Sequence, residues 1–158
     1  MRLDRPAAIQ ASPDSVRSQM RLIRPAMTVL FVDPDVASAE RLANALRSQH
    51  RVVVVGSATE ALAQMDRSTP DLIVAEIDLP DADGIELVAR WHVAPATRHA
   101  LLMIVTTRRS VQDKIAGLQA GADDYLVKPV ELPQFLAHVA SISRFRRLIH
   151  SPLTRQST

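Results

Sequence analysis

Four acidic residues follow a short apolar run near the middle of the chain. The run, residues 72–75, is rich in β-branched residues, and the acids that follow are Glu76, Asp78, Asp81 and Asp83. Such a run is typical of a strand buried on both faces. Ligands of an open parallel α/β sheet bind at the carboxyl ends of the strands. This strand would therefore deliver the Glu76 carboxylate to a ligand site.

Three further polar side chains end predicted strands in the same way: Asp33, Thr106 and Lys128. If the strands are parallel, these side chains and Glu76 meet at one edge of the sheet. The chain has 17 arginines but only two lysines, one of which is Lys128.

Apolar runs alternate with segments of helical periodicity along most of the chain. We expect strands at residues 27–32, 51–55, 71–76, 100–105 and 125–127, and helices over 36–46, 57–65, 85–92, 110–120 and 133–149. Alternation at this spacing predicts parallel βαβ units with right-handed crossovers. The predicted fold is α/β, a flavodoxin-like doubly wound sheet of five parallel strands in the order 2-1-3-4-5, with five helices.

Several helix ends carry recognisable capping residues. Asp35 is expected to cap the first predicted helix, and Ser57 with Glu60 forms a capping box. A second capping box, Ser110 with Asp113, opens a helix that ends at Gly121. We expect that helix to bury Val111, Ile115 and Leu118, and the helix after Asp35 to bury Val36, Ala39, Leu42, Ala43 and Leu46.

Residues 27–146 resemble the receiver domains of bacterial response regulators. The fragments that carry the resemblance are residues 31–33, Leu79-Pro80 with Asp83-Gly84, residues 105–107, and above all residues 120–129 (AGADDYLVKP). Each fragment alone would be weak, whereas their order and spacing together are specific. The resemblance implies the fold predicted above and a role in two-component or phosphorelay signalling.

The resemblance also implies a role for each residue at the edge of the sheet. A partner kinase or phosphotransfer protein would donate a phosphoryl group from a phosphohistidine to an aspartate at position 76. Thr106 and Tyr125 would be the switch residues, and Lys128 would neutralise charge beside a magnesium ion. The Lys128–Pro129 bond is cis in the family. Thr106 and Tyr125 could instead be ordinary strand residues that pack well.

Two departures from the family pattern fall on the site itself. Glu76 stands in the phosphoacceptor position with roughly 1.5 Å of extra reach, and Pro34 replaces one of two adjacent metal-site acids. Asp33 and Asp78 remain as weak candidate ligands, so Mg²⁺ should bind weakly or not at all. Asp78 could equally cap the turn. Glu76 is either a fixed surrogate for a phosphoryl group or a solvated acid of a decayed site.

Composition sets limits on the class of protein. The chain has 158 residues, 47% of them hydrophobic, and no cysteine, which excludes disulfides and thiolate metal sites. We expect a cytoplasmic protein with no membrane association and with its five histidines on the surface.

We expect a basic, mostly disordered extension over residues 1–26 with a short helix near 16–23, a receiver domain over 27–149, and a tail over 150–158. Residues 1–26 and 144–158 carry net charges of +3 and +4. These ends are either solvated tails or sites for nucleic acid, which we consider the weaker hypothesis.

The principal hypothesis is a stand-alone, atypical receiver that is not an enzyme and acts as a protein-interaction module. Its partners would be a sensor histidine kinase or a histidine phosphotransfer protein. The alternative is a slow phosphoaccepting receiver that uses Glu76 or Asp78. An apolar stripe at the end of the last predicted helix, Phe145, Leu148 and Ile149, suggests a homodimer, or else a frayed amphipathic end.

Overall fold

The computed structural model describes residues 12–22 and 27–149 and contains one parallel sheet in the order β2-β1-β3-β4-β5. Its strands are β1 (Thr28–Val32), β2 (Arg51–Val55), β3 (Leu72–Ala75), β4 (Leu101–Thr106) and β5 (Asp124–Val127). The helices are α1 (Pro13–Leu22), α2 (Val36–Leu46), α3 (Ala58–Arg67), α4 (Gly84–Val93), α5 (Val111–Ala120) and α6 (Leu132–Ile149). The predicted topology is confirmed.

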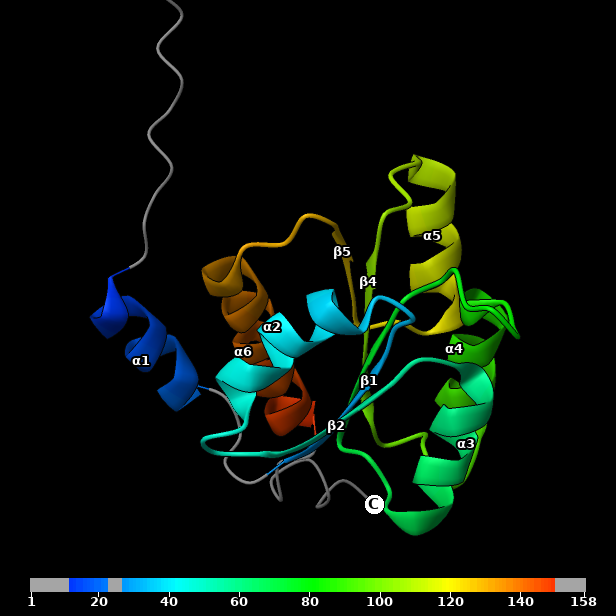
Figure 1. Ribbon diagram of the computed structural model, residues 1–158, viewed down its shortest axis with the longest axis horizontal. Helices are drawn as coiled ribbons and strands as arrows, with labels where there is room; N and C mark the ends of the chain where they lie inside the picture. Colours follow the sequence, from blue (N-terminus) through cyan, green and yellow to red (C-terminus); the bar gives the residue numbers. More distant parts are fainter. Residues whose placement is uncertain (1–11, 23–26, 150–158) are drawn as a thin grey trace, which may run out of the picture.

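Helices cover both faces of the sheet (Figure 1), which explains why its strands are continuously apolar. Within β1, Val29 and Phe31 pack in a core cluster with α2 and α6. Their neighbours Leu30 and Val32 pack in a second cluster with α3 and α4. Alternate residues of one strand therefore serve opposite cores, as the two-residue period of a strand requires.

The helix α1, which precedes β1, is longer than the short helix expected in the N-terminal segment. It begins at Pro13 rather than near residue 16, and it lies beside α6 (Figure 1). Val16 packs against the core cluster on that side of the sheet. The other residues predicted to be extension or tail, 1–11, 23–26 and 150–158, lie outside the described residues.

The predicted N-cap residues are confirmed, whereas the Glu60 carboxylate of the first capping box accepts from the Gly56 amide, at 2.8 Å. Asp35 accepts a hydrogen bond from the Ser38 amide, and Ser57 accepts one from the Glu60 amide, at 3.1 and 3.2 Å. Ser110 accepts a hydrogen bond from the Asp113 amide at 3.0 Å. Gly121 ends α5 with a φ of 121°, a conformation that residues with a Cβ rarely adopt.

The predicted buried face of α5 is wrong. Val111, Ile115 and Leu118 are 67%, 49% and 41% exposed, and Gly117 is the residue of α5 that is buried. A Cβ at Gly117 would lie 2.7 Å from Ile104 Cδ1 and 3.1 Å from Tyr125 Cδ2. The helix therefore approaches the sheet through its glycine, which turns the aliphatic residues outward. Val36, in the first turn of α2, is also exposed, whereas the other four residues predicted for that face are buried.

Candidate functional site

The predicted edge residues meet at the carboxyl ends of four adjacent strands. The sheet pairing continues past the strand ends, since the Glu76 amide donates to Val32 O at 2.9 Å and the Lys128 amide donates to Thr106 O at 2.8 Å. The Asp33 amide likewise donates to Val55 O at 2.9 Å. This pairing fixes the backbone of the site, and all four residues are buried or nearly so.

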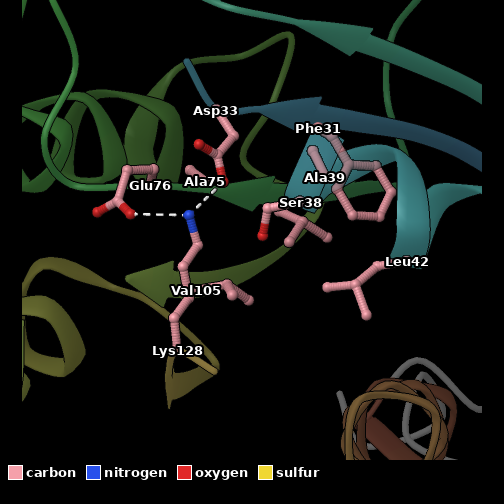
Figure 2. Close-up of a pocket in the computed structure, with 10 residues that line it drawn as sticks. Phe31, Asp33, Ser38, Ala39, Leu42, Ala75, Glu76, Val105 and Lys128 are labelled. Atoms are coloured by element: carbon pink, nitrogen blue, oxygen red, sulfur yellow. Dashed lines mark hydrogen bonds and ion pairs between the residues drawn. The ribbon is translucent and has the colours of Figure 1, made fainter. Parts of the chain in front are cut away.

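Lys128 lies between the two carboxylates (Figure 2). Its Nζ is 2.6 Å from Asp33 Oδ2 and 3.1 Å from Glu76 Oε2, and its side chain is 13% exposed. The Lys128–Pro129 peptide bond is cis. The single ammonium of the site therefore forms ion pairs with both of its acids.

The Glu76 carboxylate has hydrogen-bond partners at both of its oxygens. Oε1 accepts from the amides of Ile77 and Asp78, at 2.8 and 3.2 Å, and from the Thr106 hydroxyl. Oε2 faces Lys128. Glu76 is 5% exposed, so the description of a solvated acid at a strand end does not fit it.

Gly84 fixes the backbone of Glu76 from the side of α4. A Cβ at Gly84 would lie 2.6 Å from the Glu76 carbonyl oxygen and 2.6 Å from Ile77 Cα. The first turn of α4 can approach this closely because residue 84 has no side chain. The backbone of residue 76 is therefore held in place independently of the side chain at that position.

Burial and the neighbouring polar and charged groups have opposite effects on the pKa values of Asp33 and Lys128. Burial raises the pKa of Asp33, and this outweighs the hydrogen bonds from Lys128 and the Asp35 amide. Burial acts to lower the pKa of Lys128, but the hydrogen bonds and negative charges of Asp33 and Glu76 together raise it. Lys128 therefore remains an ammonium, held in place by its two acids.

The donors around Asp33 do not fit a magnesium site. Asp33 accepts from the Asp35 amide at 2.9 Å through one oxygen and from Lys128 through the other. Pro34 supplies no side-chain ligand, and Asp35 caps α2. In the part of the chain that the structure describes, no three His, Cys, Asp or Glu side chains are grouped to hold a metal ion. Magnesium requires hard oxygen ligands, and here an ammonium occupies the space between the two that remain.

Asp78 is bound to an arginine that the sequence interpretation missed. Arg108 Nε lies 3.0 and 3.1 Å from the two Asp78 oxygens, and this pair lowers the pKa of Asp78. The other two acids that follow β3 also have structural partners. Asp81 accepts from the Ala58 and Thr59 amides, both at 2.9 Å, and Asp83 caps α4. A contact between residues thirty positions apart leaves no spacing signal, which is why Arg108 was missed.

Tyr125 is buried beside the site. It is 5% exposed, its ring faces Gly117, and its hydroxyl donates to Arg108 O at 3.0 Å. Burial raises its pKa. The structure thus brings Asp33, Glu76, Thr106 and Lys128 together and connects Tyr125 to them through Arg108.

The histidines differ from the expectation that all of them lie on the surface. His50 is 6% exposed, and its Nδ1 accepts from the Met27 amide at 3.0 Å. His138 is partly buried, with its Nδ1 against Asp124 Oδ2. His92 and His99 are exposed as predicted, and His150 lies outside the described residues. His50 is drawn inward because the backbone amide before β1 needs an acceptor.

The fold and the site together define a class: a flavodoxin-like α/β domain with acids, a hydroxyl and a lysine at the carboxyl edge of its sheet. Residues 29–140 match the response regulator receiver domain family, and the chain belongs to that family. It is a two-component response regulator receiver domain. Among the described residues, no helix is both long and apolar enough to cross a membrane.

Named relatives and solved structures agree with this assignment. The chain is 36% identical over 117 residues to transcriptional regulatory protein TrcR of Mycobacterium tuberculosis. This alignment covers 73% of this chain and 45% of the relative. It is 36% identical over 120 residues to response regulator MprA of Mycobacterium leprae, covering 75% and 51%. The chain thus spans about half the length of these relatives. A CheY-like receiver domain protein from Methanospirillum hungatei superposes with a TM-score of 0.71 at 26% identity, covering 78% of this chain and 98% of that one.

Proposed function

We propose that this receiver acts as a protein-interaction module in two-component signalling and is not phosphorylated in the usual way. The observation that carries the proposal is the Glu76 carboxylate, which is bound by both the Thr106 hydroxyl and the Lys128 ammonium. The family resemblance assigns these two groups to a phosphoryl group on residue 76. Glu76 thus places a fixed negative charge where a transient one would otherwise form.

The same contacts oppose phosphoryl transfer to this site. Attack needs a free carboxylate oxygen aligned with the donor, and a displacement of 1 Å can cost on the order of 100-fold in rate. Both Glu76 oxygens are already bound, and its carboxylate stands one methylene too far out. Without a second acid at residue 34, magnesium would bind weakly, so calorimetric titration should detect no tight, Asp33-dependent site.

An exposed apolar face supports an interaction role. Val111, Ile115 and Leu118 stand on one side of α5, at positions i, i+4 and i+7. The helix packs beside β5, whose Tyr125 is linked through Arg108 to the Glu76 site. We propose this α5 stripe (Val111, Ile115 and Leu118) as the surface that a partner binds. The partner expected for the signalling role is a sensor histidine kinase or a histidine phosphotransfer protein.

The test is incubation with acetyl phosphate and magnesium, followed by intact-protein mass spectrometry. The wild type should gain no phosphoryl group, and Glu76→Asp should gain little because Pro34 leaves the metal site incomplete. The double variant Glu76→Asp with Pro34→Asp should be phosphorylated at least tenfold faster than Glu76→Asp alone.

Two controls decide between the proposal and the slow phosphoacceptor. Glu76→Gln and Asp78→Asn each remove one candidate acceptor. If the wild type is labelled and either substitution abolishes the label, the chain is a phosphoaccepting receiver and the proposal is wrong. An unlabelled wild type beside a labelled double variant supports the proposal.

A further inference from the structure

Four residues at the rim of the site form a closed ring of hydrogen bonds. Glu76 Oε1 accepts from the Asp78 amide at 3.2 Å and from the Thr106 hydroxyl. Arg108 closes the ring, because its guanidinium binds the Asp78 carboxylate and its amide donates to Thr106 Oγ1 at 3.3 Å. The ring connects the segment after β3 to the segment after β4, two loops thirty residues apart in the chain.

Arg108 extends the ring to two further elements. Its carbonyl oxygen accepts from the Tyr125 hydroxyl at 3.0 Å, which connects it to β5. Its guanidinium lies 3.5 Å from Asp113 Oδ1 in the first turn of α5. The amide, carbonyl and side chain of this one residue thus contact Thr106, Tyr125, Asp78 and Asp113.

We propose that Arg108 is a positioning residue, a latch that holds the β4–α5 segment with Thr106 turned toward residue 76 and Tyr125 held inward. The inference rests on the proposed function and deepens it, since the latch would fix the arrangement that presents the α5 stripe. The planar guanidinium suits this role because it can bind both oxygens of one carboxylate.

The exposure of the pair limits what the latch can do. The side chains of Arg108 and Asp78 are 42% and 53% exposed, so water screens their attraction. An exposed ion pair changes a two-state equilibrium by about two- to fivefold. Arg108 therefore biases the loop toward one arrangement and adds to the effect of Glu76, instead of locking the domain by itself.

The test is a double-mutant cycle read out by amide hydrogen exchange. The variants are Asp78→Ala, Arg108→Ala and the pair together, and the reporter is the residue 108 amide that donates to Thr106. Each single substitution should raise its exchange rate about two- to fivefold. The double variant should exchange no faster than Arg108→Ala, because that substitution already removes the pair with Asp78.

Two internal controls make the result specific. Glu40→Ala removes an exposed ion pair with Arg47 on α2 and should leave the residue 108 amide unchanged. Exchange at the buried Leu30 amide in the interior strand β1 reports global unfolding, and the loop effect must exceed any change there. No effect of Asp78→Ala, or effects of the two substitutions that simply add, would overturn the latch.

The cycle is repeated in a Glu76→Gln background so that the two proposals can fail separately. A latch that acts through Asp78 keeps its effect on the residue 108 amide in this background. Loss of the effect there would show that Glu76, not the Asp78–Arg108 pair, holds the loop, and would overturn the inference. Neither result depends on whether the wild type accepts a phosphoryl group.

Discussion

Glu76 carries less negative charge than a phosphorylated aspartate would. Its carboxylate carries about −1, whereas a phosphoryl group carries nearly −2 at neutral pH. Its contacts with Thr106 and Lys128 are nevertheless formed with no modification. Moving an equilibrium from 1:99 to 99:1 needs about 5.5 kcal/mol, which is more than one such pair supplies. Glu76 is therefore expected to bias the switch and not to lock it.

Neutralising Glu76 should release the switch residues. Glu76→Gln keeps the shape but removes the charge that faces Lys128, so Tyr125 should leave its inward position in a larger fraction of molecules. Tyr125 is the single tyrosine, which makes its ring signals assignable by NMR. Glu76→Asp is the matched variant that keeps the charge. Unchanged Tyr125 signals in Glu76→Gln would show that the charge at residue 76 plays no part in the switch.

His50 should make folding stability depend on pH. Burial lowers its pKa in the folded state below the ordinary 6.5, so the fold favours the neutral ring. The stability that this contributes is present above pH ~6.5 and is lost as the pH falls through the folded pKa. The slope should be at most about 1.4 kcal/mol per pH unit.

Urea unfolding at pH 7.5 and pH 5.5 checks this prediction. His50→Asn can still accept from the Met27 amide but cannot titrate, so the difference between the two proteins isolates His50. Equal losses of stability in both proteins would contradict the prediction.

At the scale of elements, glycine decides how two helices meet the sheet. Gly84 allows α4 to pack closely against the backbone of Glu76. Gly117 allows α5 to pack closely against Ile104 and Tyr125. Close approach of α5 leaves its large aliphatic residues in water, and these form the α5 stripe. The exposed surface of this helix is thus a consequence of its buried glycine.

Gly117→Ala should test that arrangement. Alanine gains up to about 1 kcal/mol in helix propensity, whereas overpacking costs about 1–3 kcal/mol, so we expect a net loss of about 1 kcal/mol. Tyr125 should also shift, since a Cβ would lie 3.1 Å from its ring. Gln119→Ala, at an exposed position of α5, controls for propensity alone and should not destabilise the domain. A stabilised Gly117→Ala protein would show that the neighbouring side chains yield without cost.

The sequence was sufficient for the strands because each is an apolar run that two layers of helices must cover. The positions of Glu76 and Lys128 at the edge of the sheet could be predicted from the sequence because each residue ends such a run. It failed for α5 because Val111, Ile115 and Leu118 have the spacing of a buried face while a single glycine makes the contact. It failed for Arg108 and His50 because their partners, Asp78 and the Met27 amide, are distant in the chain.

At the scale of the whole molecule, the sign of the charge changes along the chain. The middle of the chain, residues 27–143, carries −5 between two basic ends. The α6 helix leads into the C-terminal basic segment, and the apolar stripe proposed for dimerisation belongs to its last turns. The structure describes the backbone but not the side chains of Phe145, Leu148 and Ile149, so the homodimer stays a prediction.

Two substitutions test whether α6 joins two copies of the chain. Phe145→Asp and Leu148→Asp should each give monomers with little change in the unfolding midpoint. Light scattering after size-exclusion chromatography measures the mass. Gln134→Asp, at an exposed position early in α6, should leave the assembly unchanged. A wild type that is monomeric at high concentration would contradict the homodimer.

The packing of α1 beside α6 has a practical consequence for expressing the protein. A fragment cut at the limits of the family match, residues 29–140, would lose α1 and end inside α6. It would uncover the apolar surface that Val16 packs against and remove Ile142 from the same core. Uncovered apolar surface promotes aggregation. Recombinant fragments should therefore begin before Pro13 and extend through Ile149 to remain soluble.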